Sequence, residues 1–265
     1  MMALLGKIVD EKRREVAGQK QIMPVEKLMD LPMINRQTNS LKERLLHSDP
    51  CGIIAEFKRK SPSRGIINES VSVREVVRGY EKAGAAGISV LTDRVFFGGS
   101  TDDLKKARAA SLNEPILRKE FMIDEYQVIE AKAFGADVIL LIAELLSADE
   151  VRHLAGSARA LNLEVILEMH HEDQLYKICE EVDIVGINNR DLGDFSVNIN
   201  TSLDISGKIP GDRIKISESG LNSTEAIAML TGAGYRGVLI GEYFMLHPKP
   251  WKACAELIHA IRNHA

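Results

Sequence analysis

The chain has 265 residues, of which 45% are hydrophobic and 27% charged, and its formal net charge at pH 7 is −4. It is long enough to bury a full core, and one domain of this size is normal for an α/β barrel. The pI of about 6.0 gives no reason to expect nucleic acid or a membrane surface as a partner.

The cysteines and the apolar runs favour a cytoplasmic protein. Cys51, Cys179 and Cys254 are an odd number at wide spacings, which argues against a disulfide framework or a zinc site. The charged N-terminus lacks the apolar core of a signal peptide, and the longest apolar run, Val138 to Ala143, is too short to cross a bilayer. We therefore expect reduced thiols and no membrane segment.

Residues 1–50 are predicted to form a helical extension packed on a main domain. Five apolar residues lie roughly on one helical stripe, namely Leu4, Leu5, Ile8, Val9 and Val16. Further along, Ser40 followed by Glu43 is typical of a capping box at the start of another helix. Nothing in this segment indicates a catalytic role.

From residue 52 the pattern becomes regular, with short apolar runs about 20 to 34 residues apart, the length of one strand–helix unit. Eight such runs are predicted as strands: Gly52–Phe57, Gly87–Leu91, Pro115–Lys119, Val138–Ile142, Glu164–Glu168, Asp183–Ile187, Arg213–Ser217 and Gly237–Ile240. Helical patterns fill the gaps, and three more capping pairs begin helices: Asp124 with Gln127, Ser147 with Glu150, and Asn222 with Glu225. The helix expected between residues 198 and 210 has the weakest periodicity.

The order of these elements predicts the fold class. Strands that alternate with helices, without an antiparallel hairpin signal, indicate a parallel sheet. Eight units in about 210 residues fit a closed barrel better than an open sheet, and no Gly-x-Gly-x-x-Gly follows the first strand. We predict an α/β protein with a single (β/α)8 TIM barrel as its catalytic domain over residues 51–265, and a helical N-terminal extension over residues 1–50.

Polar side chains follow several of the predicted strands where the active sites of such barrels lie. They are Glu56, Lys58, Lys119, Glu168, Asn188, Arg190 and Glu218. Alternation along the strand supports an inward orientation, since Glu168 shares parity with Ile166, and Glu218 with Ile216. A single charged residue at a strand end is usually a solvated loop residue. Polar residues at the carboxyl ends of five separate strands, however, favour a common site.

The residue types suit acid–base chemistry. Three carboxylates and three cations around one mouth would shift one another's pKa values. No spacing typical of a metal site is present, and a helix-start or loop role is expected for His170 and His171 rather than ligation. No Ser-His-Asp or Cys-His arrangement is evident. Neither a metal nor another cofactor is expected.

Glycine-bearing turns follow the last two predicted strands. They contain Ser219 with Gly220, and Gly241 with Glu242, where backbone N–H groups could approach a phosphate. Each turn alone could be an ordinary connection, but together they indicate a phosphorylated small-molecule substrate. After the second strand, Phe97 is followed by Gly98 and Gly99. Its ring could form an aromatic wall for a ring-bearing substrate, or it could simply pack over the top of the barrel.

These motifs together resemble the indole-3-glycerol phosphate synthase family across essentially the whole chain. Ile54-Ala-Glu-Phe-Lys-Arg-Lys-Ser-Pro-Ser63 is similar to its first-strand signature, and this motif is the most specific. The other matching segments follow in order: Ile88–Asp93, Phe97–Ser100, Leu117–Phe121, Leu167–His170, Gly186–Leu192, Ser217–Gly220 and Gly237–Gly241. Asp93 is a departure, since many members carry Glu at this position.

The resemblance implies a carbon–carbon lyase of tryptophan biosynthesis. The substrate would be 1-(2-carboxyphenylamino)-1-deoxyribulose 5-phosphate, which closes to indole-3-glycerol phosphate with loss of CO2 and water. Lys119 would protonate the carbonyl oxygen and Glu168 would serve proton removal and dehydration, while Lys58 would bind an anionic group and is the alternative acid. Glu56 and Glu218 would orient the lysines.

The resemblance also implies the binding residues. Asn188 and Arg190 would bind the sugar hydroxyls or the carboxylate, and Ser61 would lie near the carboxylate on the ring. Phe97, Phe121 and Leu239 would contact the substrate, and the phosphate would lie at the turns of Gly220 and Gly241. The family leads us to expect a monomer.

Two rival functions remain open at this point. Another phosphosugar barrel, such as phosphoribosylanthranilate isomerase, usually uses a Cys/Asp pair, whereas Cys51 precedes the first strand here and Cys179 and Cys254 are expected in helices. A non-catalytic barrel that binds a phosphate ester would need the glycine turns but neither Lys119 nor Glu168.

Overall fold

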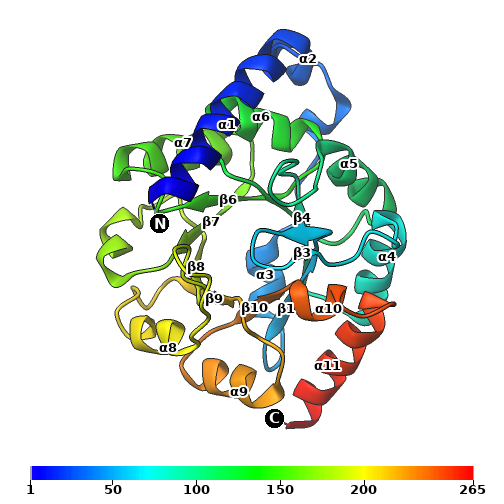
Figure 1. Ribbon diagram of the computed structural model, residues 1–265, viewed down its shortest axis with the longest axis vertical. Coiled ribbons are helices and arrows are strands. Elements are labelled where there is room, and N and C mark those ends of the chain that lie inside the picture. The colour runs from blue at the N-terminus through cyan, green and yellow to red at the C-terminus, as the bar shows by residue number, and fades with distance from the viewer. Residues whose placement is uncertain (1, 265) are drawn as a thin grey trace.

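Eight parallel strands close into a barrel with helices around it in the computed structural model, which describes residues 2–264 (Figure 1). The strand order around the barrel is β1-β10-β9-β8-β7-β6-β5-β4, so each strand pairs with its neighbours along the chain and the last closes on the first. The barrel strands are β1 (Gly52–Phe57), β4 (Gly87–Leu91), β5 (Ile116–Lys119), β6 (Val138–Ile142), β7 (Glu164–Met169), β8 (Ile184–Asn188), β9 (Ile214–Glu218) and β10 (Gly237–Ile240). The predicted (β/α)8 fold and helical N-terminal segment are confirmed, with strand ends shifted by at most one residue.

The helices are α1 (Met2–Ile22), α2 (Val25–Met29), η1 (Pro32–Asn35), α3 (Leu41–Leu46), α4 (Val73–Ala83), α5 (Thr101–Ala110), α6 (Glu125–Ala133), α7 (Ala148–Ala160), η2 (Glu172–Lys177), α8 (Asn200–Ser206), α9 (Thr224–Gly232), α10 (Glu242–Met245) and α11 (Pro250–His264). Several of the helices begin at polar caps, among them α3, α4, α5, α6, α7 and α9. The capping boxes predicted at Asp124 and Ser147 are confirmed, and the Ser40 side chain accepts a hydrogen bond from the N–H of Glu43.

Three local predictions are wrong. The cap of α9 is Ser223 rather than Asn222, because the Ser223 hydroxyl accepts the N–H of Ala226. Cys179 follows η2 in a loop instead of lying in a helix. The loop after β1 contains an antiparallel hairpin, β2 (Lys60–Ser61) with β3 (Gly65–Ile66), whose strands are too short for any periodicity to reveal.

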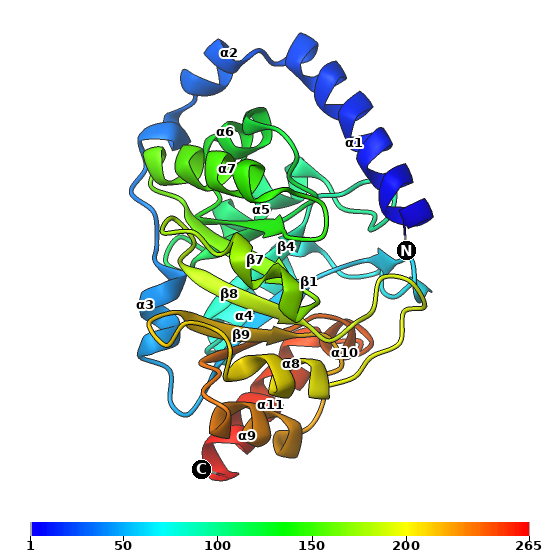
Figure 2. The ribbon, with the colours of Figure 1, turned by 90° about the vertical axis from the view of Figure 1, so that its left-hand side faces the viewer.

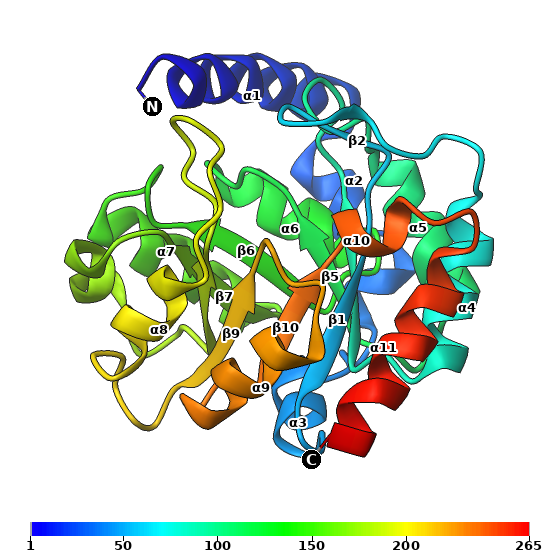
Figure 3. The same cartoon turned by 60° about the horizontal axis from the view of Figure 1, so that its bottom comes forward.

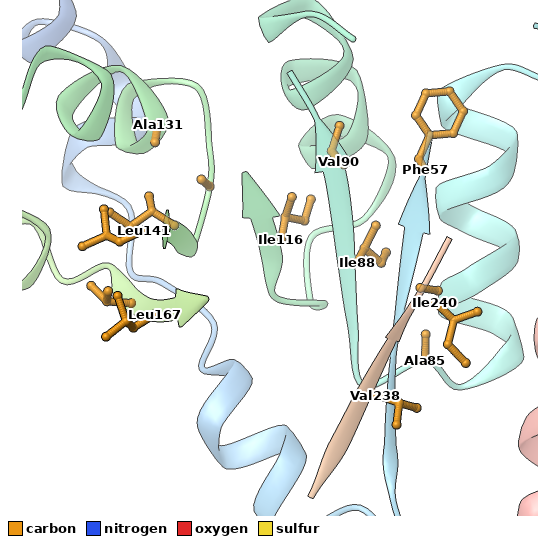
Figure 4. Packing of buried hydrophobic residues seen from close by; sticks show 14 of the residues in the cluster. Phe57, Ala85, Ile88, Val90, Ile116, Ala131, Leu141, Leu167, Val238 and Ile240 are labelled. Atoms are coloured by element: carbon orange, nitrogen blue, oxygen red, sulfur yellow. The ribbon is translucent and has the colours of Figure 1, made fainter. Parts of the chain in front are cut away.

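Alternation along each strand divides the core into two layers. Outward-facing side chains form one layer with residues of the helices such as Ala131, and Figure 4 shows Ile88, Val90 and Ile116 of this layer. Inward-facing residues fill the barrel, for example Leu140 and Ile166. The inward parity then continues toward the carboxyl end of the strands, where the polar site residues follow.

The amino end of the barrel is closed by α3. Leu41 and Leu45 on this helix are buried and belong to the inner layer of the core. Leu45 lies so close to Gly52 that a Cβ on the glycine would be 2.7 Å from Leu45 Cδ2. The Glu164 carboxylate accepts the N–H groups of Leu41 and Lys42, which fixes the start of the helix against β7.

The opposite end of the barrel carries α1. This helix lies across the end to which the strands point, well away from α3 (Figures 2 and 3). Leu5 and Ile8 on α1 are buried, whereas the side chain of Leu4, the first member of the predicted stripe, lies outside the described part. Among the helices of residues 2–264, none has the length and apolar character needed to span a bilayer.

Candidate active site

A cavity of about 600 Å³ opens at the carboxyl ends of the barrel strands. All the site residues predicted from the sequence line it: Glu56, Lys58, Ser61, Phe97, Lys119, Phe121, Glu168, Asn188, Arg190, Glu218, Ser219, Gly220, Leu239, Gly241 and Glu242. Parallel strands bring them together, because residues far apart in sequence end at the same rim.

Lys119 lies at the centre of the charged cluster. It follows inward-facing Leu117 by two residues on β5, so its side chain also points into the barrel. Its Nζ is 2.8 Å from Glu168 Oε2 and also contacts Glu218 Oε2. The three side chains are at most 14% exposed, so a buried ammonium bridges two buried carboxylates.

A hydrogen-bond network holds the Glu168 carboxylate. The Asn188 amide donates to Glu168 Oε1 over 3.1 Å, while Asn188 Oδ1 accepts the Ser219 hydroxyl and the Arg190 N–H. His170, which is also buried, places Nε2 3.5 Å from the same Oε1. The Asn188 amide is therefore oriented by two donors, and it orients Glu168 in turn.

His171 has the helix-start role expected from the sequence, because it directly precedes η2 as its N-cap residue.

A second ion pair joins the two polar residues at the end of β1. Lys58 Nζ is 2.8 Å from Glu56 Oε1, and the Ser89 hydroxyl donates to Glu56 Oε2 over 3.3 Å. The Lys58 side chain is 15% exposed, so its ammonium faces the cavity, while the Glu56 side chain is buried beneath it. Glu56 thus orients Lys58 toward any ligand.

The buried charges shift one another's pKa values in opposite directions. Burial raises the pKa of Glu218 to about 7, and the carboxylates of Glu168 and Glu56 add to the effect. Burial also opposes ionisation of Glu168, but Lys119, His170 and the Asn188 amide outweigh it and lower the pKa of Glu168. The same carboxylates overcome burial to raise the pKa of Lys119. At neutral pH the ammonium and the Glu168 carboxylate are charged, and Glu218 is the group that gains or loses a proton.

The turns after β9 and β10 leave no room for a side chain at Gly220 and Gly241. Ser219 and Gly220 both have positive φ values, 72° and 75°, so two successive residues are in the left-handed region. A Cβ on Gly220 would lie 2.3 Å from Val197 Cγ1, and one on Gly241 would lie 2.3 Å from Glu56 Oε1. Both turns therefore bring bare backbone up to the cavity, as phosphate recognition requires.

The side chain of Glu242 is engaged differently from a phosphate ligand. Its carboxylate pairs with Arg64 Nε at 2.8 Å and lies 3.4 Å from an Arg190 guanidinium nitrogen. A carboxylate repels phosphate, so a contribution of Glu242 to phosphate binding would have to come from its backbone. The same ion pairs show that Arg64, which sequence reasoning missed, brings another cation to this rim.

The opposite wall of the cavity is apolar. The rings of Phe97 and Phe121 lie 6.0 Å apart and are tilted by 46°, and Leu5 and Ile8 of α1 complete this side. The sequence indicated the two aromatic residues through the loop after β4 and the motif after β5. The sequence carried no signal that placed α1 here, because the apolar stripe of α1 looks like any packing face.

Within residues 2–264, no group of three or more His, Cys, Asp or Glu side chains could hold a metal ion.

Comparisons with known proteins agree with this geometry. The family profile described as indole-3-glycerol phosphate synthase matches residues 5–257. An indole-3-glycerol phosphate synthase of Bacteroides thetaiotaomicron is 43% identical, with 99% of this chain and 100% of the relative covered, and one of an Acidovorax species is 39% identical, with 97% and 99% covered.

A solved structure shows the fold alone. The thiamine phosphate pyrophosphorylase of Pyrococcus furiosus superposes with a TM-score of 0.58 at 18% identity, over 85% of this chain and 98% of that chain. The matches to the two relatives go further, because both are at least 39% identical over nearly the whole of each chain and the family profile spans residues 5–257. The chain therefore belongs to the indole-3-glycerol phosphate synthase family.

Proposed function

We propose that the chain closes the ring of 1-(2-carboxyphenylamino)-1-deoxyribulose 5-phosphate to give indole-3-glycerol phosphate, as a carbon–carbon lyase of the carboxy-lyase class. The observation that supports this best is a buried ammonium, Lys119, which two carboxylates hold in the same cavity as an aromatic pair. The reaction needs an acid, a proton acceptor and a ring site in one cavity, and these groups supply all three.

The first step forms a carbon–carbon bond. The ring carbon that bears the carboxylate attacks the ribulose carbonyl carbon, and the carbonyl oxygen takes a proton to become a hydroxyl. Lys119 is the proposed donor, because its side chain lines the cavity and its ammonium contacts both carboxylates. Loss of CO2 then returns the bonding electrons to the ring and restores its aromaticity.

The second stage removes water. A proton leaves the carbon next to nitrogen, and the new hydroxyl takes up a proton from the recharged Lys119 ammonium and departs as water, which forms the indole double bond. Glu168 is the proposed acceptor, since the low pKa keeps it ionised and Asn188 fixes its orientation. Glu218, with its pKa near neutrality, is suited to return the proton to Lys119.

The substrate has two anionic groups, the ring carboxylate and the phosphate, and the cavity offers a binding region for each. Lys58, Ser61 and Arg190 would hold the ring carboxylate, and the turns at Gly220 and Gly241 would hold the phosphate. Every residue of this arrangement belongs to one chain, so we propose that the monomer is the active form, which the mass of the active species in solution tests.

One assay separates this proposal from its rivals. The purified chain is offered the carboxyphenylamino substrate, and indole fluorescence is followed, with Lys119→Met as the control for a contaminating enzyme. Product formation that disappears in the control is expected. Saturable binding without fluorescence would instead indicate a non-catalytic barrel. An isomerase built on a Cys/Asp pair is disfavoured, because neither Cys51, Cys179 nor Cys254 lines the cavity.

A further inference from the structure

A buried cation on α1 has no part in the proposed chemistry. Lys12 is 2% exposed, although it lies on a helix whose outer face carries charged residues in water. Its ammonium is 2.8 Å from Asp93 Oδ2 and 3.1 Å from Glu120 Oε1, and a third carboxylate, Glu15, lies 2.5 Å away on the same helix. Burying a charge at this depth is costly without partners, and here two of the partners come from the loops that follow two barrel strands, β4 and β5.

Each of the two barrel carboxylates holds the backbone of one aromatic residue in the cavity wall. Asp93 Oδ1 accepts the N–H groups of Phe96 and Phe97, at 2.6 and 2.9 Å. Glu120 Oε1 accepts the N–H of Phe121 at 2.9 Å, and its other oxygen accepts the Thr92 hydroxyl at 2.7 Å. One ammonium is therefore connected, through one carboxylate each, to both members of the Phe97–Phe121 pair.

The same helix face reaches the cavity directly. Leu5, Ile8 and Lys12 are three and four residues apart, so they lie on one side of α1. Leu5 and Ile8 line the cavity beside the aromatic pair. Docking of Lys12 between the two carboxylates thus fixes three parts of one apolar wall: the helix and the two rings.

We propose that Lys12 is a positioning residue that sets the aromatic wall for the ring of the substrate. The carboxylates of Asp93 and Glu120 are 1% and 4% exposed. Without the ammonium, Asp93 would lose its salt-bridge partner, and Glu120 would keep only Arg118, at 4.0 Å. One of them would then take up a proton or turn away, and its hold on an aromatic backbone would weaken. This inference rests on the proposed function, because it needs a ring-bearing substrate.

The test is Lys12→Met, which keeps the length of the side chain and removes its charge. Loss of both aromatic contacts with the ring is expected to raise KM about 10-fold, which corresponds to about 1.4 kcal/mol. The kcat should stay within about 2-fold, because Lys119 and Glu168 are untouched. The Kd of indole-3-glycerol phosphate should rise with KM, whereas the Kd of inorganic phosphate, which lacks a ring, should not change.

The chain offers a matched control in Lys20→Met. Lys20 also joins α1 to the barrel, through an ion pair of 2.8 Å with Asp124, but it lies far along the helix from the cavity wall. Its removal should leave KM unchanged. An equal rise of KM in both variants would show that general docking of α1 matters, and would overturn the role of Lys12.

A second variant keeps the test decisive if Lys12→Met is unstable. Adding Glu120→Gln to it restores the buried net charge while the ammonium bridge stays absent, so the double variant should be more stable but keep the raised KM. A wild-type KM in whichever variant folds, or a Kd for inorganic phosphate that rises as much as KM, would overturn the proposal. Turnover by the wild-type chain tests the proposed function separately, since it does not depend on Lys12.

Discussion

Replacing Lys119 with Met removes the ammonium that both Glu168 and Glu218 contact, at nearly constant side-chain length. We expect kcat to fall by about 10²- to 10⁴-fold, the usual contribution of a positioned general acid. The two carboxylates keep their places at the ends of β7 and β9, so the loss reflects the missing proton donor rather than a collapsed cavity.

The Lys119→Met substitution should also lower the free energy of unfolding. Removing one partner of a buried ion pair usually costs about 3–5 kcal/mol, because a charge is left unpaired. Here Glu218 already has a pKa of about 7, and without Lys119 it would be protonated at neutral pH, which relieves part of the cost. We therefore expect a loss of about 3 kcal/mol, or roughly 6–12 °C in Tm for a chain of this size.

The assay combines indole fluorescence with thermal unfolding of three proteins: wild type, Lys119→Met, and Lys119→Met with Glu218→Gln. The double variant leaves a single carboxylate where there were two, so it should recover most of the lost Tm and none of the lost turnover. Turnover near the wild-type value in a correctly folded Lys119→Met would refute the acid role of Lys119.

Three further predictions follow from the same cavity. Glu168→Gln should lower kcat by about 10²-fold or more with KM changed only a few-fold, whereas an unchanged kcat with a greatly raised KM would move the carboxylate role to Glu56. Because burial raises the pKa of Glu218 from 4.5 to about 7, the folded chain holds a proton there that the unfolded chain releases, and that stabilisation is lost as pH rises through 7. The Tm of Glu218→Gln minus the Tm of the wild type should therefore increase between pH 5 and pH 8. A Tm difference that stays constant over this range would contradict the raised pKa of Glu218. Gly220→Ala should weaken binding of inorganic phosphate, since φ is 75° and the new Cβ would meet Val197, while a ligand structure with phosphate at the turn after Ser61 would argue against this site.

The sequence alone determined the barrel fold and which residues lie at the carboxyl ends of its strands. Short apolar runs at regular spacing can pair as parallel strands, and a period of two decides which residues face inward, so Lys119, Glu168 and Glu218 could be placed in one cavity from local pattern. The same local rules failed where an element was too short to carry a period, as in the β2–β3 hairpin, and shifted a cap by one residue at Ser223.

Tertiary structure alone decided which charges meet and how they ionise. Lys119 and Glu218 are 99 residues apart in sequence, and their contact depends on closure of the barrel. The opposite pKa shifts of Glu168 and Glu218 arise from burial and from the neighbours of each carboxylate, which no spacing encodes. The position of α1 is the clearest case: a helical stripe predicts that a face is buried but not against what, so the link from Lys12 to the aromatic wall could be found only in the folded chain.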